Sequence, residues 1–141
     1  MKVFVSCAVL LFVASVMEAN ANPLADYKWK NRIIVASMPD GKEQREAAAG
    51  LKQKKAGILD RDLIVIDVTP KRMRTSGTIR LSRQATEELR ERLSIGDAPV
   101  FVLIGKDGGV KSRQSSSLNH EKFFALIDTM PMRKEEMRKN R

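Results

Sequence analysis

Residues 33–38, with the sequence IIVASM, and residues 63–68, with the sequence LIVIDV, decide the fold of this chain. Both are short, almost continuous apolar runs rich in β-branched residues, which is typical of strands buried on both faces of a sheet. Between them, Asp40 precedes Glu43 by three residues, the spacing of a capping box, and a stretch rich in Ala, Glu, Gln and Lys continues to about Lys55. Strand, helix and strand in this order predict a right-handed parallel βαβ unit.

The rest of the chain adds a second helix, a hairpin and a last helix. Ser82 and Asn119 belong to the residue types preferred as helix N-caps. The pair Asp107-Gly108 is a strong hairpin signal, and Pro131 ends the last helix because proline cannot continue helical hydrogen bonding. The expected elements are a first helix that stops at Gly57, a loop at 70–77, a helix from Ser82 to about Leu93, strands at 100–104 and 110–115, and a helix from Asn119 to Met130.

The predicted order is therefore β-α-β-α-β-β-α, which is the order of the thioredoxin fold. We expect an α/β protein with a mixed four-stranded sheet and helices on both faces. Residues 22–131 are enough for one core and too few for two ordinary domains, so we expect a single domain. Residues 132–141 are charged, and we expect them to form a loosely held tail.

The N-terminal segment has the pattern of an export signal. Lys2 provides a positive charge, residues 3–16 are mainly apolar, and residues 19–21, ANA, match an A-x-A cleavage site. The apolar run is shorter than the roughly 20 residues that a bilayer span needs. We therefore expect residues 1–21 to be removed and the remaining chain to work in the periplasm or outside the cell. The one cysteine, Cys7, lies in the segment to be removed.

Without Cys7, the exported chain has no thiol for catalysis, for a disulfide or for binding a metal. Enzymes with the thioredoxin fold carry their reactive cysteine between the first strand and the first helix, and here residues 38–41 read MPDG. Composition thus excludes disulfide exchange and cysteine-based peroxide reduction. Asp40 is expected to cap the helix rather than act as an acid. His120, the single histidine, is expected at the surface and lacks the partners of a metal site, so no cofactor is expected.

Basic side chains concentrate between residues 70 and 83, a stretch without any acidic residue. The formal net charge of +9 favours anionic partners but equally confers solubility. Two explanations stay open: a site for an anionic glycan, a lipid head group or an acidic protein, or a solvated loop. Nucleic acid is disfavoured because no aromatic residue is interleaved for base stacking. The candidate binding residues are Lys71, Arg72, Arg74, Arg80 and Arg83.

Three stretches carry a resemblance to a known family. They are residues 22–32, residues 104–111 with the sequence IGKDGGVK, and residues 124–133, which end with Met-Pro-Met-Arg. In these stretches the chain resembles the bacterial family named domain of unknown function 4174, which is related to domains of vertebrate extracellular proteins with sushi repeats. The resemblance covers the chain after residue 21. It implies a thioredoxin-like fold and an extracytoplasmic location, and it brings no catalytic residues.

Pro99 stands immediately before the third predicted strand. In this place it resembles the cis-proline that thioredoxin-like proteins hold beside their active-site loop. The alternative is an ordinary trans proline at the first residue of a strand, a position where sheets tolerate proline.

Three functions are compatible with these patterns. The first is an exported, non-catalytic domain that binds a ligand or partner through its basic segment. The second is an enzyme whose chemistry does not use cysteine, at a cleft near Asp40 and Pro99. The third is a structural role in an envelope assembly. The sequence favours the first, because export and a thioredoxin-like order occur here without the thiol on which this fold usually relies.

Overall fold

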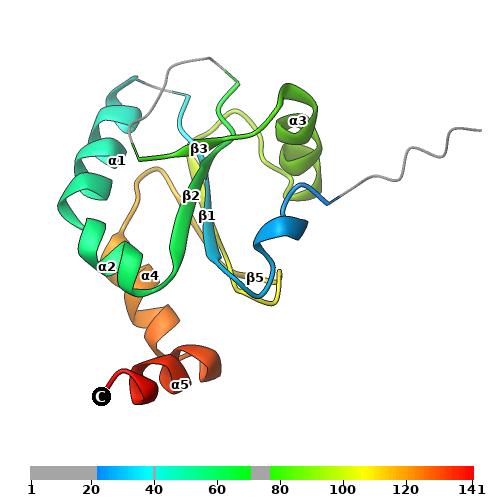
Figure 1. Ribbon diagram of the computed structural model, residues 1–141. Coiled ribbons are helices and arrows are strands. Elements are labelled where there is room, and N and C mark those ends of the chain that lie inside the picture. The colour runs from blue at the N-terminus through cyan, green and yellow to red at the C-terminus, as the bar shows by residue number, and fades with distance from the viewer. Residues whose placement is uncertain (1–21, 40, 71–76) are drawn as a thin grey trace, which may run out of the picture.

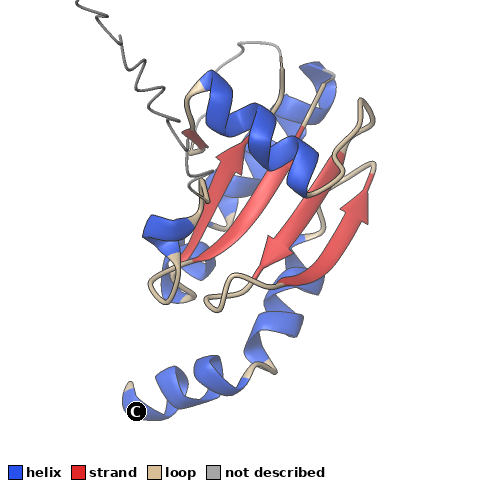
Figure 2. Ribbon diagram, turned by 90° about the vertical axis from the view of Figure 1, so that its right-hand side faces the viewer, coloured by secondary structure: helices blue, strands red, loops and turns tan. Residues whose placement is uncertain are grey.

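The computed structural model describes residues 22–39, 41–70 and 77–141, so the expected signal segment at 1–21 lies outside the described residues. The strands are β1 (Arg32–Ser37), β2 (Leu63–Asp67), β3 (Ile79–Arg80), β4 (Val100–Ile104) and β5 (Val110–Ser115). The helices are the short 3-10 helix η1 (Ala25–Tyr27), α1 (Gly41–Gln53), α2 (Lys55–Asp60), α3 (Arg83–Arg92), α4 (His120–Asp128) and α5 (Pro131–Lys139). One mixed sheet in the order β3-β2-β1-β4-β5 forms the centre (Figures 1 and 2).

Strand β1 is the centre of the sheet, and all six of its residues are buried. It pairs in parallel with β2, which confirms the predicted parallel βαβ unit, and it pairs antiparallel with β4. Alternate side chains of β1 point to opposite faces. Ile33 and Val35 belong to one apolar cluster, and Ile34 and Ala36 belong to the other.

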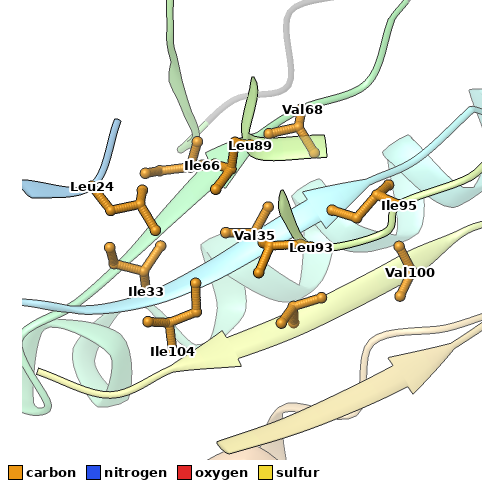
Figure 3. Packing of buried hydrophobic residues seen from close by; sticks show 11 residues of the cluster. Leu24, Ile33, Val35, Ile66, Val68, Leu89, Leu93, Ile95, Val100 and Ile104 are labelled. Atoms are coloured by element: carbon orange, nitrogen blue, oxygen red, sulfur yellow. The ribbon is translucent and has the colours of Figure 1, made fainter. Parts of the chain in front are cut away.

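Each face of the sheet is covered by its own helices (Figure 1). On one face, α3 and the segment around η1 contribute Leu24, Leu89 and Leu93, which pack against Ile33 and Val35 (Figure 3). On the other face, α1 and α4 contribute their apolar stripes to the second cluster; these residues are Ala47, Leu51, Phe123 and Ile127. No helix within the described ranges has both the length and the apolar character that a membrane span requires.

The caps confirm two predicted helix starts, whereas the first helical region differs from its prediction. Ser82 Oγ accepts a hydrogen bond from the Ala85 amide at 3.2 Å, and Asn119 Oδ1 accepts one from the Lys122 amide at 3.0 Å. The first helix does not stop at Gly57, because a turn at Lys54 divides it into α1 and α2 and Gly57 lies inside α2. The ring of Phe124 lies where a Cβ at position 57 would be, 2.8 Å from Cε2, so this glycine permits close packing and does not end the helix.

The sheet has five strands rather than the expected four. The additional strand, β3, pairs in parallel with β2 through Ile66 with Ile79 and Asp67 with Arg80. Two residues are too few to produce an alternating or continuous apolar pattern, and therefore this strand could not be predicted from the sequence.

The C-terminal segment forms helix α5 instead of the expected loose tail. Pro131 begins this helix, since the first position of a helix needs no amide donor. Arg133 is 3% exposed, and it donates to the Asp60 carbonyl at 2.7 Å, to the Asp60 carboxylate and to Asp128 Oδ1 at 3.2 Å. Arg61 forms a second, two-pronged pair with Asp128. These bonds join α5 to α2 and α4.

Glu136 of α5 neutralises two buried cations at the amino-terminal end of β1. Arg32 is 1% exposed, and its guanidinium makes two hydrogen bonds to the Glu136 carboxylate, at 3.1 and 3.2 Å. Lys106 Nζ donates to Glu136 Oε1 at 2.7 Å and to Asp62 Oδ2 at 2.8 Å. Burial opposes ionisation of Glu136, but the bonds from Arg32 and Lys106 outweigh it and hold the pKa of this carboxyl below its ordinary value.

Replacing Glu136 by Gln should destabilise the fold, because Arg32 would stay buried without an opposite charge. Breaking a buried ion pair from one side costs about 3–5 kcal/mol, and the partial exposure of Glu136 places our expectation near the lower end, about 3 kcal/mol. Urea unfolding measures this difference. Glu135→Gln is the matched control, since Glu135 makes an exposed pair with Arg138 on the same helix and its loss should be nearly neutral. Equal effects of the two substitutions would contradict the role given to Glu136.

The free energy of unfolding should also fall in acid, because two carboxyls have lowered pKa values in the folded protein. The pKa of Asp128 is lowered because the hydrogen bonds from Arg61 and Arg133 outweigh the opposing effect of burial, and the pKa of Glu136 is lowered likewise. A carboxyl whose pKa is lower in the folded state stabilises the fold above its unfolded pKa, which is about 4, and this stabilisation is lost as pH falls through the folded value. Urea midpoints measured from pH 6 downward should therefore decline, and Glu136→Gln should decline less steeply. Parallel curves for the two proteins would be the contrary result.

Candidate functional site

The carboxyl ends of β1 and β2 meet at one edge of the sheet because the two strands are parallel. Just beyond them, Thr69 Oγ1 accepts a hydrogen bond from the Met38 amide at 2.8 Å. At this edge a cleft of about 560 Å³ lies between the end of β2, strand β3 and the first turns of α3, a volume suited to a small ligand. Its charged lining residues are Asp67, Arg80, Arg83, Glu87 and Arg90, and the others are Thr69, Pro70, Leu81 and Thr86.

Asp67, the last residue of β2, is a buried carboxylate in the wall of the cleft. It is 1% exposed, and its Oδ1 accepts a hydrogen bond from the Thr69 amide at 2.9 Å. Its Oδ2 has no hydrogen-bond partner among the residues that the structure describes. Arg80 Nε lies 3.8 Å from this oxygen, close enough for electrostatic attraction but too far for a hydrogen bond. The hydrogen bond to Oδ1 thus fixes the orientation of the carboxylate, while Oδ2 is left to accept a hydrogen bond from another group.

Arg80 and Arg83 bring two guanidinium groups to the cleft from β3 and α3. Arg80 Nη2 donates to the Thr69 carbonyl at 3.3 Å, which holds the side chain across the end of β2. Arg83 is 85% exposed and pairs with Glu87, which is 65% exposed, at 3.0 Å. Exposed pairs of this kind contribute little to stability, so an incoming anion can take the place of Glu87 at small cost.

Arg90 fixes the position of α3 against the end of the sheet. Its guanidinium donates to Ser37 Oγ at 3.0 Å, to the Val68 carbonyl at 3.0 Å and to the Gly96 carbonyl at 2.9 Å. It therefore joins β1, the segment after β2 and the segment before β4. Arg90 does not stand out in the sequence because helix α3 carries many charges; its position seven residues after Arg83, on the same helix face, is the available signal.

The structure brings part of the predicted basic segment together. Arg80 and Arg83 both line the cleft, and Arg90 joins them. Lys71, Arg72 and Arg74 lie outside the described residues. A role of these residues in binding stays a prediction.

The place where thioredoxin-fold enzymes carry their reactive cysteine is occupied by a buried methionine. Met38 directly follows β1 and is 0% exposed, and α1 begins at Gly41. Asp40, expected to cap α1, lies outside the described residues. Because a thioether cannot form a thiolate, this position offers no nucleophile.

Pro99 is a trans proline, contrary to the expected cis form. No peptide bond in the described part of the chain is cis. The trans form is the ground state of an X-Pro bond, and Pro99 stands just before β4, where the missing amide hydrogen costs no bond in the sheet. Pro99 is not among the residues that line the cleft beside Asp67, so the expected pairing of Asp40 and Pro99 at one cleft gains no support here.

His120 is buried, not at the surface as expected. It is 6% exposed at the start of α4 and packs against α1, where a Cβ at Gly50 would lie 2.6 Å from its Cε1. Burial lowers the pKa of His120, so the neutral ring is favoured. Within the described part of the chain, no group of three or more His, Cys, Asp or Glu residues could hold a metal ion.

Solved structures with the same fold include several redox proteins. Reduced 2-Cys peroxiredoxin of Plasmodium vivax aligns with a TM-score of 0.57 and 14% identity, over 79% of this chain and 84% of that chain. The exposed lipoprotein thioredoxin Etrx1 of Streptococcus pneumoniae aligns with a TM-score of 0.53 and 12% identity, over 76% of this chain and 90% of that one. The thioredoxin domain of a thiol-disulfide oxidoreductase from Bacteroides vulgatus has a TM-score of 0.53 and 13% identity, over 74% and 81% of the two chains. These similarities confirm the α/β thioredoxin-like fold.

Comparison with known sequences identifies the family of the chain, and that family has no described activity. No curated protein matches the sequence. A family model matches residues 23–136, which reaches beyond the domain end expected at residue 131 and into helix α5. The chain therefore belongs to the family described as Domain of unknown function (DUF4174).

Proposed function

We propose that this protein is an exported binding module that uses a thioredoxin-like scaffold without thiol chemistry. The cleft between β2, β3 and α3 is its ligand site, and the ligand carries a negative charge. The observation that supports this proposal most is the convergence of Arg80, Arg83 and Arg90 on one cleft of about 560 Å³.

The electrostatics of the cleft favour an anion. The described residues of its lining include three guanidinium groups against two carboxylates. One of those carboxylates, Glu87, is held only by an exposed pair and is easily displaced. The first turn of α3 also faces the cleft, and the amino end of a helix favours negative charge. Guanidinium groups bind carboxylates, phosphates and sulfates with two parallel hydrogen bonds, which adds geometric selectivity to the charge attraction.

The cleft is also rigid enough to select a ligand. Arg90 is tied to three acceptors, and Asp67 is tied to the Thr69 amide, so the walls are held in place before binding. A preformed site loses less conformational entropy on binding than a flexible loop does. An anionic glycan, a lipid head group and an acidic protein each present a suitable group. Lys71, Arg72 and Arg74 follow the lining residue Pro70 in the sequence, and we include them in the proposal as further candidates for binding such a partner.

Arg83→Ser should weaken anion binding without unfolding the protein, since the side chain of Arg83 is exposed and makes only a surface pair. Sulfate is a suitable probe, titrated by isothermal calorimetry at about 0.15 M salt, where charges more than about 8 Å away are screened. We expect at least a fivefold loss of affinity, in keeping with the loss of one charge-assisted hydrogen bond.

Lys134→Ser is the matched control for that titration. It removes the same charge from an exposed position on α5, away from the cleft, and should leave sulfate affinity unchanged. Equal losses for Arg83→Ser and Lys134→Ser, or no sulfate binding by the unaltered protein, would contradict the proposed site.

The proposed export predicts a defined amino terminus for the mature protein. When the complete chain is expressed in a bacterium with a general secretion pathway, the protein recovered outside the cytoplasm should begin at Asn22, because the A-x-A pattern ends at Ala21. Intact-mass measurement of the recovered protein tests this. A cytoplasmic protein that retains residues 1–21 would be the opposite outcome.

A further inference from the structure

From the geometry at Asp67 we infer that the ligand carries a hydroxyl hydrogen-bond donor beside its anionic group, as a sugar acid does. This inference rests on the proposed function, because it concerns the same cleft. It identifies Asp67 as the residue that determines which anions are accepted.

The first argument is the unused acceptor of Asp67. Oδ1 is held by the Thr69 amide at 2.9 Å, whereas Oδ2 is buried and has no hydrogen-bond partner within residues 22–39, 41–70 and 77–141. A buried polar atom without a partner is unfavourable and uncommon in native proteins. Two hydroxyls, those of Thr69 and Thr86, add further polar surface to the same lining. A donor on the ligand would satisfy the oxygen that the fold leaves open.

The second argument is the position of Arg80 relative to Asp67. Arg80 Nε is 3.8 Å from Oδ2, and its Nη2 makes a bond of 3.3 Å to the Thr69 carbonyl. An anion in the cleft attracts this guanidinium away from the carboxylate. The ligand hydroxyl then donates to Oδ2 in its place, so that Arg80 and Asp67 contact neighbouring groups of one molecule. An anion without a donor would draw Arg80 away and leave Asp67 Oδ2 without a partner, although Oδ1 keeps its bond to the Thr69 amide.

The third argument is the balance of charge and size. Among the described residues, the lining holds three arginines and two carboxylates, so one anionic group on the ligand balances the net charge of these five side chains, and each further anionic group adds repulsion from Asp67 and Glu87. A cleft of about 560 Å³ accommodates one sugar-sized ring. Leu81 and Pro70 provide apolar surface against which the face of such a ring can lie.

Three ligands of similar size test the inference on the unaltered full-length protein by calorimetric titration. Glucuronate carries both the carboxylate and hydroxyls, cyclohexanecarboxylate carries the carboxylate alone, and glucose carries hydroxyls alone. We expect glucuronate to bind at least tenfold more tightly than cyclohexanecarboxylate, the difference that one hydrogen bond to a charged acceptor provides. Glucose should bind more weakly than either. A uronic acid polymer titrated alongside distinguishes the two sources: binding per chain end at least as tight as that of free glucuronate indicates a glycan terminus, and weaker binding per chain end indicates a free sugar acid.

Asp67→Asn provides a second test with a signature that a structural defect would not produce. It removes the charged acceptor and also the repulsion of the anion. Glucuronate affinity should therefore fall while cyclohexanecarboxylate affinity stays the same or rises. Equal binding of the two carboxylates by the unaltered protein would overturn the inference and leave the proposed anion site intact. Binding of none of the carboxylates would overturn the proposed function itself.

Discussion

Strand β1 is buried along its whole length, including the polar side chains at its two ends. The surrounding helices are placed so that they cover its apolar residues and provide partners for its polar ones. Its apolar residues require a helical layer on each face of the sheet. Arg32 and Ser37, at its first and last positions, are 1% and 0% exposed, and buried polar groups need partners. The carboxylate of Glu136 in α5 accepts a hydrogen bond from Arg32, and the guanidinium of Arg90 in α3 donates one to Ser37. One strand thus determines where both of these helices must lie.

The two ends of β1 differ in what they leave accessible. At the amino end, the charges of Arg32 and Lys106 are compensated by the carboxylates of Glu136 and Asp62, and the network ties α5 to the body of the domain. At the carboxyl end, Arg90 donates a hydrogen bond to Ser37, and the adjoining residues of β2, β3 and α3 line an open cleft. The chain thereby places a basic cleft at the edge of the sheet where β1 and β2 end, and the buried Met38 directly follows β1 at the same edge.

Much of this architecture could be predicted from the sequence, because its long elements have strong local patterns. The apolar runs of β1, β2 and β4, the caps at Ser82 and Asn119 and the hairpin turn were all predictable. The features that could not be predicted share a physical cause, since each depends on contacts between distant residues. The two-residue strand β3 exists by pairing with β2, α5 is fixed by ion pairs with distant residues, and His120 is buried because Gly50 leaves room for it. Arg80 and Arg83 were found by charge alone, whereas Asp67 and Arg90 needed the three-dimensional structure.

The central claim is that an anion binds beside the carboxyl end of β2 without any thiol. Heteronuclear NMR, with the backbone amides assigned and glucuronate titrated in, tests it most directly. The account predicts saturable shifts concentrated at Asp67, Thr69, Arg80 and the first turns of α3, with the amides of α5 unaffected. Shifts spread evenly over the basic surface, or concentrated at α5 or the β4–β5 hairpin, would contradict it.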